Sequence, residues 1–162
     1  RISESVHAQS DALLIVDGIT SVGVLPFEKD KWHIDVVVSG SQKGVMIPPG
    51  LAFISLNERA WQRAAHSDLP KYYLSLLKAR KSLGQQTTPF TPATTLLVGL
   101  RLSLEMMMAR GLEYFWDKYA RLAHSTREGA KAAGLELFAK TPSNALTAIK
   151  IPHELEGQKY VK

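Results

Sequence analysis

The chain has 162 residues, enough for one domain, and 45% of them are hydrophobic, which is ordinary for a globular protein. The formal net charge is a modest +5, and the Lys and Arg residues are scattered, so we expect neither nucleic acid nor a membrane as a partner. The absence of cysteine excludes disulfides and thiolate chemistry within these residues, and no apolar run reaches the ~18 residues of a membrane span.

The first third of the chain predicts a helix followed by short strands. Residues 1–10 resemble the end of a helix, and residues 12–16 form a continuous apolar run, as in a strand buried on both faces of a parallel sheet. Two more strand candidates are 34–38 and 51–55. The segment 44–50 between them contains adjacent prolines flanked by glycines, which predicts a shaped loop.

Helices dominate the prediction for the middle of the chain. Asn57 is a favourable N-cap for a helix that reaches about His66. Apolar residues at helical spacing predict further helices over 69–82 and 93–109, joined by a Thr- and Pro-rich connection.

The last part of the chain predicts a helix and a strand pair. Gly111 is expected to end the long helix, and another helix is expected to run to about Ala133. The segments 135–138 and 146–151 then predict two strands.

One acid and one lysine follow the predicted strands. Asp17 comes directly after 12–16, and Lys43 follows 34–38 through four small or polar residues. Open α/β sheets bind ligands at such strand ends. A lysine there can form a Schiff base, and an aspartate can pair with a pyridinium nitrogen, as in pyridoxal-phosphate enzymes. We expect Lys43 to be partly desolvated. The alternatives are a surface lysine and, for Asp17, a helix N-cap or an Asx-turn.

Three motifs occur in order along the chain: Val16-Asp17-Gly18-Ile19-Thr20-Ser21-Val22-Gly23, Ser39-Gly40-Ser41-Gln42-Lys43-Gly44 and Pro48-Pro49-Gly50. Together they resemble the class V aminotransferases, above all the alanine–glyoxylate and serine–pyruvate types. The segment Thr88-Pro89-Phe90-Thr91-Pro92-Ala93 is similar to the family's phosphate-touching turn. The resemblance covers nearly the whole chain and corresponds to a middle segment of the much longer family members.

This resemblance implies an α/β fold, a three-layer α/β/α sandwich with a mostly parallel sheet. Residues 1–110 would be the C-terminal part of the large domain that binds pyridoxal phosphate, and 111–162 the beginning of a small α+β domain. The implied reaction moves an amino group from alanine or serine to glyoxylate or pyruvate, in a homodimer. The family's glycine-rich phosphate turn, ring-stacking aromatic and carboxylate-binding arginine would lie outside this chain, so we expect the chain alone to be incomplete.

The resemblance also assigns residues to the cofactor. Lys43 is implied to form the Schiff base with pyridoxal phosphate, and Asp17 to pair with its pyridine nitrogen. Ile19 is implied to pack on the ring, although plain core packing explains an apolar residue there equally well. Gln42 is implied to reach the phosphate. At this position, immediately before the lysine, cysteine desulfurases typically have a histidine.

Thr91, supported by Thr88, is implied to donate its hydroxyl to the phosphate of the neighbouring subunit. The alternative for both threonines is a hydroxyl bonded to local backbone. The rival functions are another class V enzyme, such as a cysteine desulfurase or a lyase, and a non-catalytic interaction module. No histidine spacing or carboxylate cluster indicates a metal site. No targeting pattern is visible in this segment, so we expect the cytoplasm or, in a eukaryote, the matrix of a peroxisome or mitochondrion.

Overall fold

The computed structural model describes residues 2–152, which divide into two compact units. Residues 2–19 and 28–104 belong to the first unit, and residues 20–27 and 105–152 belong to the second. Every residue that the sequence assigns to the cofactor falls in the first unit. No helix of the described residues is long and apolar enough to cross a membrane.

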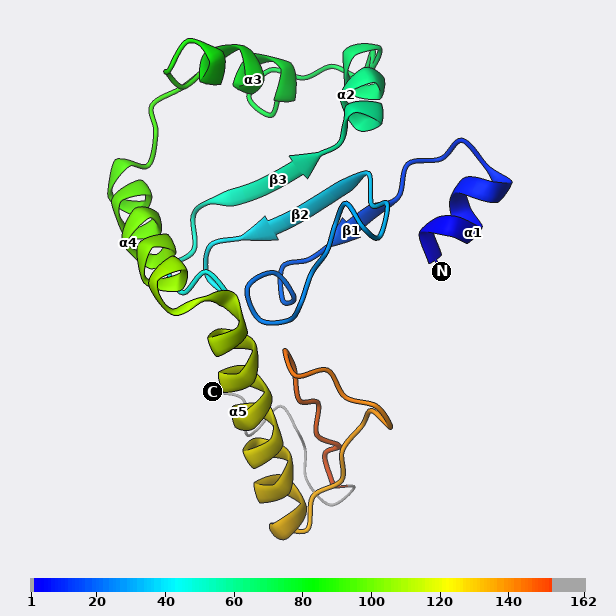
Figure 1. The fold of residues 1–162 in the computed structure, drawn as a ribbon, viewed down its shortest axis with the longest axis vertical. Coiled ribbons are helices and arrows are strands. Elements are labelled where there is room, and N and C mark those ends of the chain that lie inside the picture. Colours follow the sequence, from blue (N-terminus) through cyan, green and yellow to red (C-terminus); the bar gives the residue numbers. More distant parts are fainter. Residues whose placement is uncertain (1, 153–162) are drawn as a thin grey trace. The chain divides into compact units, whose positions relative to one another are not determined.

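A three-stranded sheet lies in the first unit, in the order β1 (Ile15–Asp17), β2 (Val36–Gly40) and β3 (Ala52–Leu56) (Figure 1). β1 pairs in parallel with β2, and Asp17 lies opposite Val38. β2 pairs with β3 in the antiparallel direction. The chain is therefore an α/β protein whose described sheet combines one parallel and one antiparallel pairing. The parallel pair brings the carboxyl ends of β1 and β2 to the same edge of the sheet.

The first strand is shorter and more open than predicted. It begins at Ile15 instead of residue 12, because the backbone N–H of Leu14 donates to the carboxylate of Asp35 at 2.7 Å instead of joining the ladder. Ile15 is 61% exposed, so the expectation of a strand buried on both faces is wrong for the described residues. β1 has only β2 as a neighbour among them, and its other edge is open.

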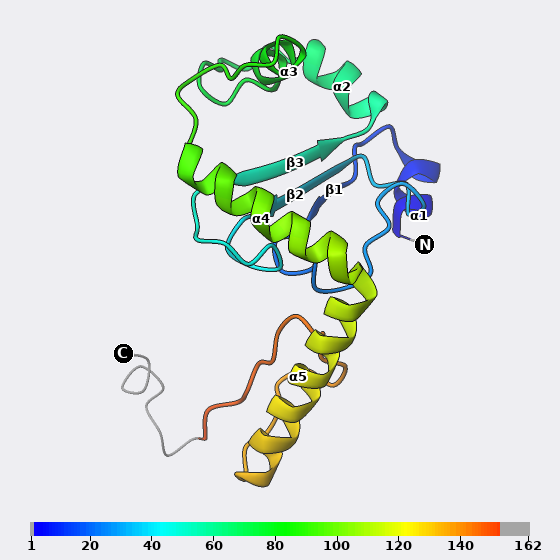
Figure 2. The ribbon, with the colours of Figure 1, turned by 60° about the vertical axis from the view of Figure 1, so that its left-hand side comes forward.

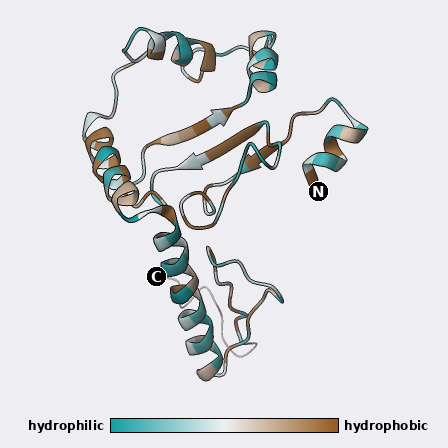
Figure 3. Cartoon of the chain, viewed as in Figure 1, coloured by the Kyte–Doolittle hydropathy of each residue, from teal (hydrophilic) through white to brown (hydrophobic). Residues whose placement is uncertain are grey.

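The core of the first unit forms around β2. Its buried apolar side chains come from β2, from the segments on either side of it, and from α2 (Glu58–Ala65). These side chains are Ile34, Val36, Val37, Val45 and Ala60. Figure 3 shows the matching pattern, with the three strands largely apolar.

Two helices at the start of the chain and after β3 agree with the sequence. α1 (Ile2–Gln9) occupies the predicted helical segment. α2 begins after Asn57, whose side-chain Oδ1 accepts the Ala60 N–H at 2.9 Å, so the predicted cap is confirmed. The helix ends at Ala65 with His66 as its C-cap, which agrees with the predicted end at about His66.

The next helix begins later than predicted. α3 spans Leu76–Gly84, not 69–82, because Ser75 caps it and accepts the Lys78 N–H at 3.3 Å. Residues 67–75 form bends and turns around Pro70, which has no N–H to donate to a helix. The apolar spacing of this segment therefore does not reflect a helix, and several of its side chains remain exposed.

Two long helices follow, α4 (Thr94–Arg110) and α5 (Leu112–Ala132) (Figure 2). The predicted break at Gly111 is confirmed, and its φ of 79° lies in the region that favours glycine. In the second unit, the buried apolar side chains are Val24, Met107, Phe115, Ala123 and Ala130.

The predicted strand pair after α5 is reduced to one antiparallel bridge. Leu137 pairs with Ile149, flanked by the hydrogen bonds from Phe138 N–H to Ala148 O at 2.9 Å and from Lys150 N–H to Glu136 O at 2.8 Å. The two segments pair only with each other in the described part of the chain, and an isolated two-stranded pairing is marginal.

Candidate active site

The two residues singled out at the strand ends leave the same edge of the sheet. Asp17 is the last residue of β1, and the Gly18 N–H extends the ladder by donating to Val38 O at 2.8 Å. β2 ends at Gly40, and Lys43 lies in the turn that follows directly. Because β1 and β2 are parallel, the carboxylate and the lysine follow neighbouring strand ends, as an open α/β binding site requires.

Asp17 directs the chain as it leaves β1. Its Oδ1 accepts the Ile19 N–H at 2.9 Å, which is the Asx-turn that the sequence allowed as an alternative. The side chain is exposed, and it lines a cavity of about 730 Å³ together with Trp32 and the residues of β1. Lys43 does not line this cavity. The turn holds the carboxylate at the strand end, where it can also meet a ligand.

Two of the predicted cofactor residues meet at Gly40. A side-chain carbon added there would lie 2.9 Å from Oε1 of Gln42 and 3.2 Å from Cδ1 of Ile19. Only a residue without a side chain leaves these two groups room to lie beside the end of β2. The structure therefore brings an apolar group and an amide together next to the lysine turn.

Lys43 is held by its backbone and exposed at its side chain. Its carbonyl accepts the Met46 N–H at 2.9 Å and closes the turn. Met46 itself has a φ of 62°, an uncommon conformation for a residue with a side chain. Within residues 2–152 the expected desolvation of Lys43 is wrong, since polar neighbours and a tight turn leave its side chain open.

The two threonines lie between α3 and α4 and are both exposed. Thr88 Oγ1 donates to Phe90 O at 2.8 Å, which is the local turn bond that the sequence allowed. The Phe90 ring packs against Tyr73 and Tyr72, with centroids 4.7 and 5.7 Å away. These aromatic contacts fix the turn. The role of Thr91 at the cofactor phosphate stays a prediction.

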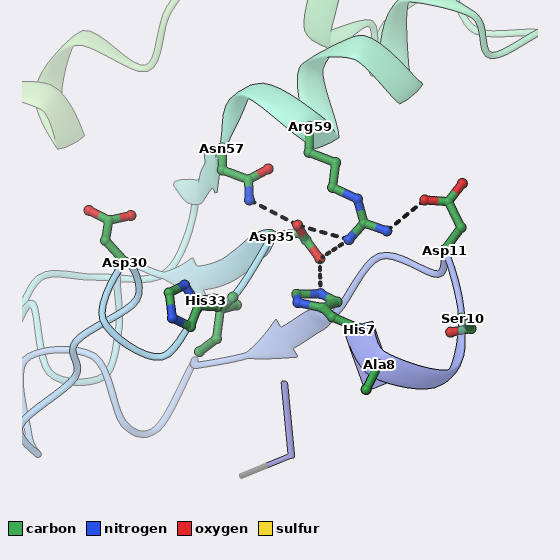
Figure 4. Close-up of a pocket in the computed structure, with 10 residues that line it drawn as sticks. His7, Ala8, Ser10, Asp11, Asp30, His33, Asp35, Asn57 and Arg59 are labelled. Atoms are coloured by element: carbon green, nitrogen blue, oxygen red, sulfur yellow. Dashed lines mark hydrogen bonds and ion pairs between the residues drawn. The ribbon is translucent and has the colours of Figure 1, made fainter. Parts of the chain in front are cut away.

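Sequence reasoning missed a polar cluster at the other end of β2. A cavity of about 870 Å³ is lined there by polar side chains from α1, α2 and the approach to β2 (Figure 4). Asp35 is 1% exposed. Its carboxylate receives hydrogen bonds from His7 Nε2 at 3.0 Å, Asn57 Nδ2 at 2.9 Å and Arg59 Nη1 at 3.2 Å. The one signal in the sequence was an acid inside an apolar run, which burial permits only with partners.

The cluster also sets the charge state of the buried acid. Burial by itself raises the pKa of Asp35, but hydrogen bonds from the Leu14 N–H, Asn57 and His7, together with the charge of Arg59, lower that pKa to about 2. The other side of the Arg59 guanidinium pairs with Asp11 at 3.0 Å. Each of these side chains is hydrogen-bonded to Asp35 or to Arg59, so the cluster joins α1, the start of β2 and α2. The cluster lies at the opposite end of β2 from Lys43.

Known proteins match the chain along nearly its whole length. Residues 1–158 match the family described as aminotransferase class-V. The chain is 47% identical to the soluble hydrogenase small subunit of Synechococcus sp. (strain PCC 6716) over 97% of its own length and 41% of that protein's. It is 37% identical to the serine–glyoxylate aminotransferase of Hyphomicrobium methylovorum over 96% of its length and 40% of that protein's.

Solved structures agree with this match. The chain superposes on the crystal structure of an alanine–glyoxylate aminotransferase from Nostoc sp. with a TM-score of 0.91 and 26% identity, covering 98% of this chain and 43% of that one. The chain thus spans about two fifths of the length of the proteins that it matches. By sequence, by fold and by the order of its strand-end motifs, it belongs to the class V aminotransferase family.

Proposed function

We propose that the protein is a pyridoxal-phosphate-dependent transaminase that passes the amino group of a small L-amino acid, alanine or serine, to a 2-oxo acid, glyoxylate or pyruvate. Lys43 is the covalent attachment point, and the working unit is a homodimer.

One observation carries this proposal: β1 and β2 run parallel and deliver Asp17 and Lys43 to the same edge of the sheet. The residues beside them fit the cofactor. The contacts at Gly40 place an apolar side chain, Ile19, next to an amide, Gln42, and an aromatic phosphate ester needs one group of each kind. The three polar groups match three parts of the cofactor: the amine of Lys43 its aldehyde, the carboxylate of Asp17 its ring nitrogen, and the amide of Gln42 its phosphate.

Bound pyridoxal phosphate supplies an aldehyde that captures amines and a ring that takes up the electrons released at the substrate's Cα. Lys43 would hold the cofactor through its amine, and its Nζ would carry the proton of the substrate's Cα. Asp17 keeps a proton on the ring nitrogen. Gln42 binds the phosphate, and Ile19 packs against the ring and keeps water from it.

Support for the acceptor comes from the relatives. Both the serine–glyoxylate enzyme and the alanine–glyoxylate structure take glyoxylate by name, while their amino donors differ. Glyoxylate is therefore the acceptor with most support, and the donor is assigned only as a small L-amino acid.

The dimer would complete the site. The segment before Thr91 exposes large apolar side chains, among them Leu74 at 83% and Tyr72 at 72%. A surface of this kind is typical of a protein interface. A second subunit packed against this segment would bring Thr91 to the neighbour's phosphate, which is the role proposed for it here.

The test uses the full-length protein. Borohydride reduction after incubation with pyridoxal phosphate, followed by peptide mass mapping, should place a pyridoxyl group on Lys43. Lys43→Ala should lose the label and all multiple-turnover transamination with glyoxylate. Lys131→Ala removes a surface lysine of α5 whose amine pairs with Glu128 at 2.8 Å; this variant is the matched control and should keep both the label and the activity.

A label on a different lysine would overturn the assignment of Lys43. A protein that takes no label would instead favour a non-catalytic module. A hydrogenase assay on the same preparation checks the activity that the name of the Synechococcus sp. (strain PCC 6716) relative carries.

A further inference from the structure

A fully buried hydroxyl lies two residues before the lysine. Ser41 is 0% exposed. Its Oγ donates to Pro48 O at 2.8 Å and accepts the Leu51 N–H at 3.2 Å. Its backbone adds two more hydrogen bonds, from its own N–H to Leu51 O at 3.1 Å and from the Ile47 N–H to its carbonyl at 3.2 Å. One serine thus ties together the two ends of the loop that begins at β2 and ends at β3.

A second serine holds the other side of the lysine turn. Ser103, in the part of α4 that belongs to the first unit, is 5% exposed, and its Oγ donates to the carbonyl of Val45. The same face of α4 contacts the loop again, since a side-chain carbon added at Gly99 would lie 3.8 Å from Cγ2 of Ile47. The helix therefore fixes the loop from outside, while Ser41 fixes it from within.

Between these two anchors the backbone has little freedom. Ser41, Gly44 and Val45 are buried, whereas Gln42 and Lys43 are exposed. The left-handed backbone of Met46 comes directly after the carbonyl held by Ser103. Such a conformation is unfavourable for a residue with a side chain and persists only where its surroundings impose it.

Building on the function proposed above, we propose that Ser41 and Ser103 are positioning residues for Lys43. They fix the backbone on both sides of the turn, so that the lysine amine moves only by rotation of its own side chain. A group that must both hold a cofactor and carry a proton gains from such a fixed base, because small misplacements of reacting groups are costly.

The chain offers a matched control for both serines. Ser39 lies two residues before Ser41, and its Oγ is buried without a hydrogen-bond partner among the described residues. Ser39→Ala therefore removes the same atom from a serine of β2, two positions before Ser41, and breaks no side-chain hydrogen bond among the described residues. Ser103→Thr keeps the hydroxyl on α4 and is the conservative variant.

The first experiment needs no cofactor. Amide hydrogen exchange of the full-length protein is followed in the peptide that covers residues 46–51. In Ser41→Ala, the Leu51 amide loses the Oγ that accepts its hydrogen bond and should exchange about tenfold faster, the scale of one lost buried hydrogen bond. Ser103→Ala should accelerate the Met46 amide, whereas Ser39→Ala and Ser103→Thr should match the wild type. Unchanged exchange in both alanine variants would overturn the proposed anchoring.

The second experiment separates positioning from a general structural role. The pH midpoint of the visible absorbance band of the cofactor-loaded protein, and the fraction of Lys43 that borohydride labels, report on the lysine itself. Ser103→Ala should shift the midpoint and lower the labelled fraction several-fold, and Ser103→Thr should restore both. Ser103 lies on α4, so this test still holds if Ser41→Ala fails to fold.

The two proposals fail in different ways. Wild-type protein without a label on Lys43 would refute the proposed function, whatever the exchange rates show. The positioning role alone would be refuted if the wild-type protein is labelled on Lys43 and both Ser103→Ala and Ser41→Ala have the same pH midpoint and labelled fraction as the wild type.

Discussion

Asp35 shows how one buried charge can be kept ionised. Its carboxylate has lost contact with water and receives hydrogen bonds from residues 14, 57, 59 and 7 instead. A buried carboxylate with these partners is stable, whereas loss of a partner leaves an uncompensated charge. The sequence could show only that an acid interrupts an apolar run, because the partners lie 21 to 28 positions away in either direction.

This network predicts a pH dependence of stability. The pKa of Asp35 falls from 3.8 to about 2 on folding, so its contribution is complete above pH 4 and disappears as the pH falls toward 2. The contribution amounts to about 2 kcal/mol. Urea unfolding of the full-length protein between pH 6 and 2 should show this loss. Asp35→Asn should be less stable at pH 6 and should have a shallower dependence on pH. An equal slope in the two proteins would mean that other carboxylates set the acid limit.

Asp17 has a different role from Asp35, because its side chain is exposed and, among the described residues, its carboxylate accepts only the Ile19 N–H of its own turn. Asp17→Asn keeps the oxygen that accepts the Ile19 N–H and removes the negative charge. We expect transamination to lose on the order of 3 kcal/mol of transition-state stabilisation, the scale of one preorganised electrostatic contact. Thermal unfolding should remain close to that of the wild type. Normal turnover in this variant would reduce Asp17 to a turn residue.

At the scale of elements, local signals were sufficient where a single residue decides the boundary. Asn57 and Gly111 fixed two helix ends because capping and a left-handed φ depend on the residue itself. The start of α3 was missed because the Ser75 cap competed with apolar spacing that continued before it. For the site, the shared edge of β1 and β2 was predictable from two strands followed by polar residues, but the anchors from α4 were not.

The loop after Lys43 and α4 fit together at Gly50, which gives a prediction for this pair of elements. A side-chain carbon at Gly50 would lie 2.5 Å from Cδ1 of Leu96, and the φ of Gly50 is 139°. Gly50→Ala should therefore cost about 1–3 kcal/mol of unfolding free energy. Part of this cost should disappear when Leu96→Ala is already present, as a double-mutant cycle would measure.

Gly84 supplies the control for that cycle. It is the last residue of α3, and a side-chain carbon there would have no atom within 4 Å. Gly84→Ala should be neutral or stabilising by up to about 1 kcal/mol. If Gly50→Ala and Gly84→Ala change the unfolding free energy equally, the close fit between the loop and α4 is not the reason why position 50 requires glycine.

At the scale of the whole molecule, the first unit leaves much apolar surface without cover. Ile15 on β1 and Ile54 on β3 are exposed, and so are Leu69 and Leu74 before α3. One edge of β1 has no partner strand among the described residues. Sheets with parallel strands are normally covered on both faces, and an open apolar edge invites association. These surfaces are the places where the remainder of a longer chain, or a second subunit, would pack.

The isolated 162-residue chain should therefore behave differently from the full-length protein. We expect the isolated chain to associate non-specifically and to unfold without a sharp transition, because the sheet and the segment around Leu74 stay exposed. We expect the full-length protein to be a dimer that unfolds cooperatively and binds pyridoxal phosphate. Three measurements compare the isolated chain with the full-length protein: light scattering after size-exclusion chromatography for the oligomeric state, urea unfolding for cooperativity, and a titration with pyridoxal phosphate for binding. An isolated chain that proved to be a soluble, cooperative monomer and bound the cofactor would show that its own core is sufficient for the site, and the dimer proposed for Thr91 would then lose its main support.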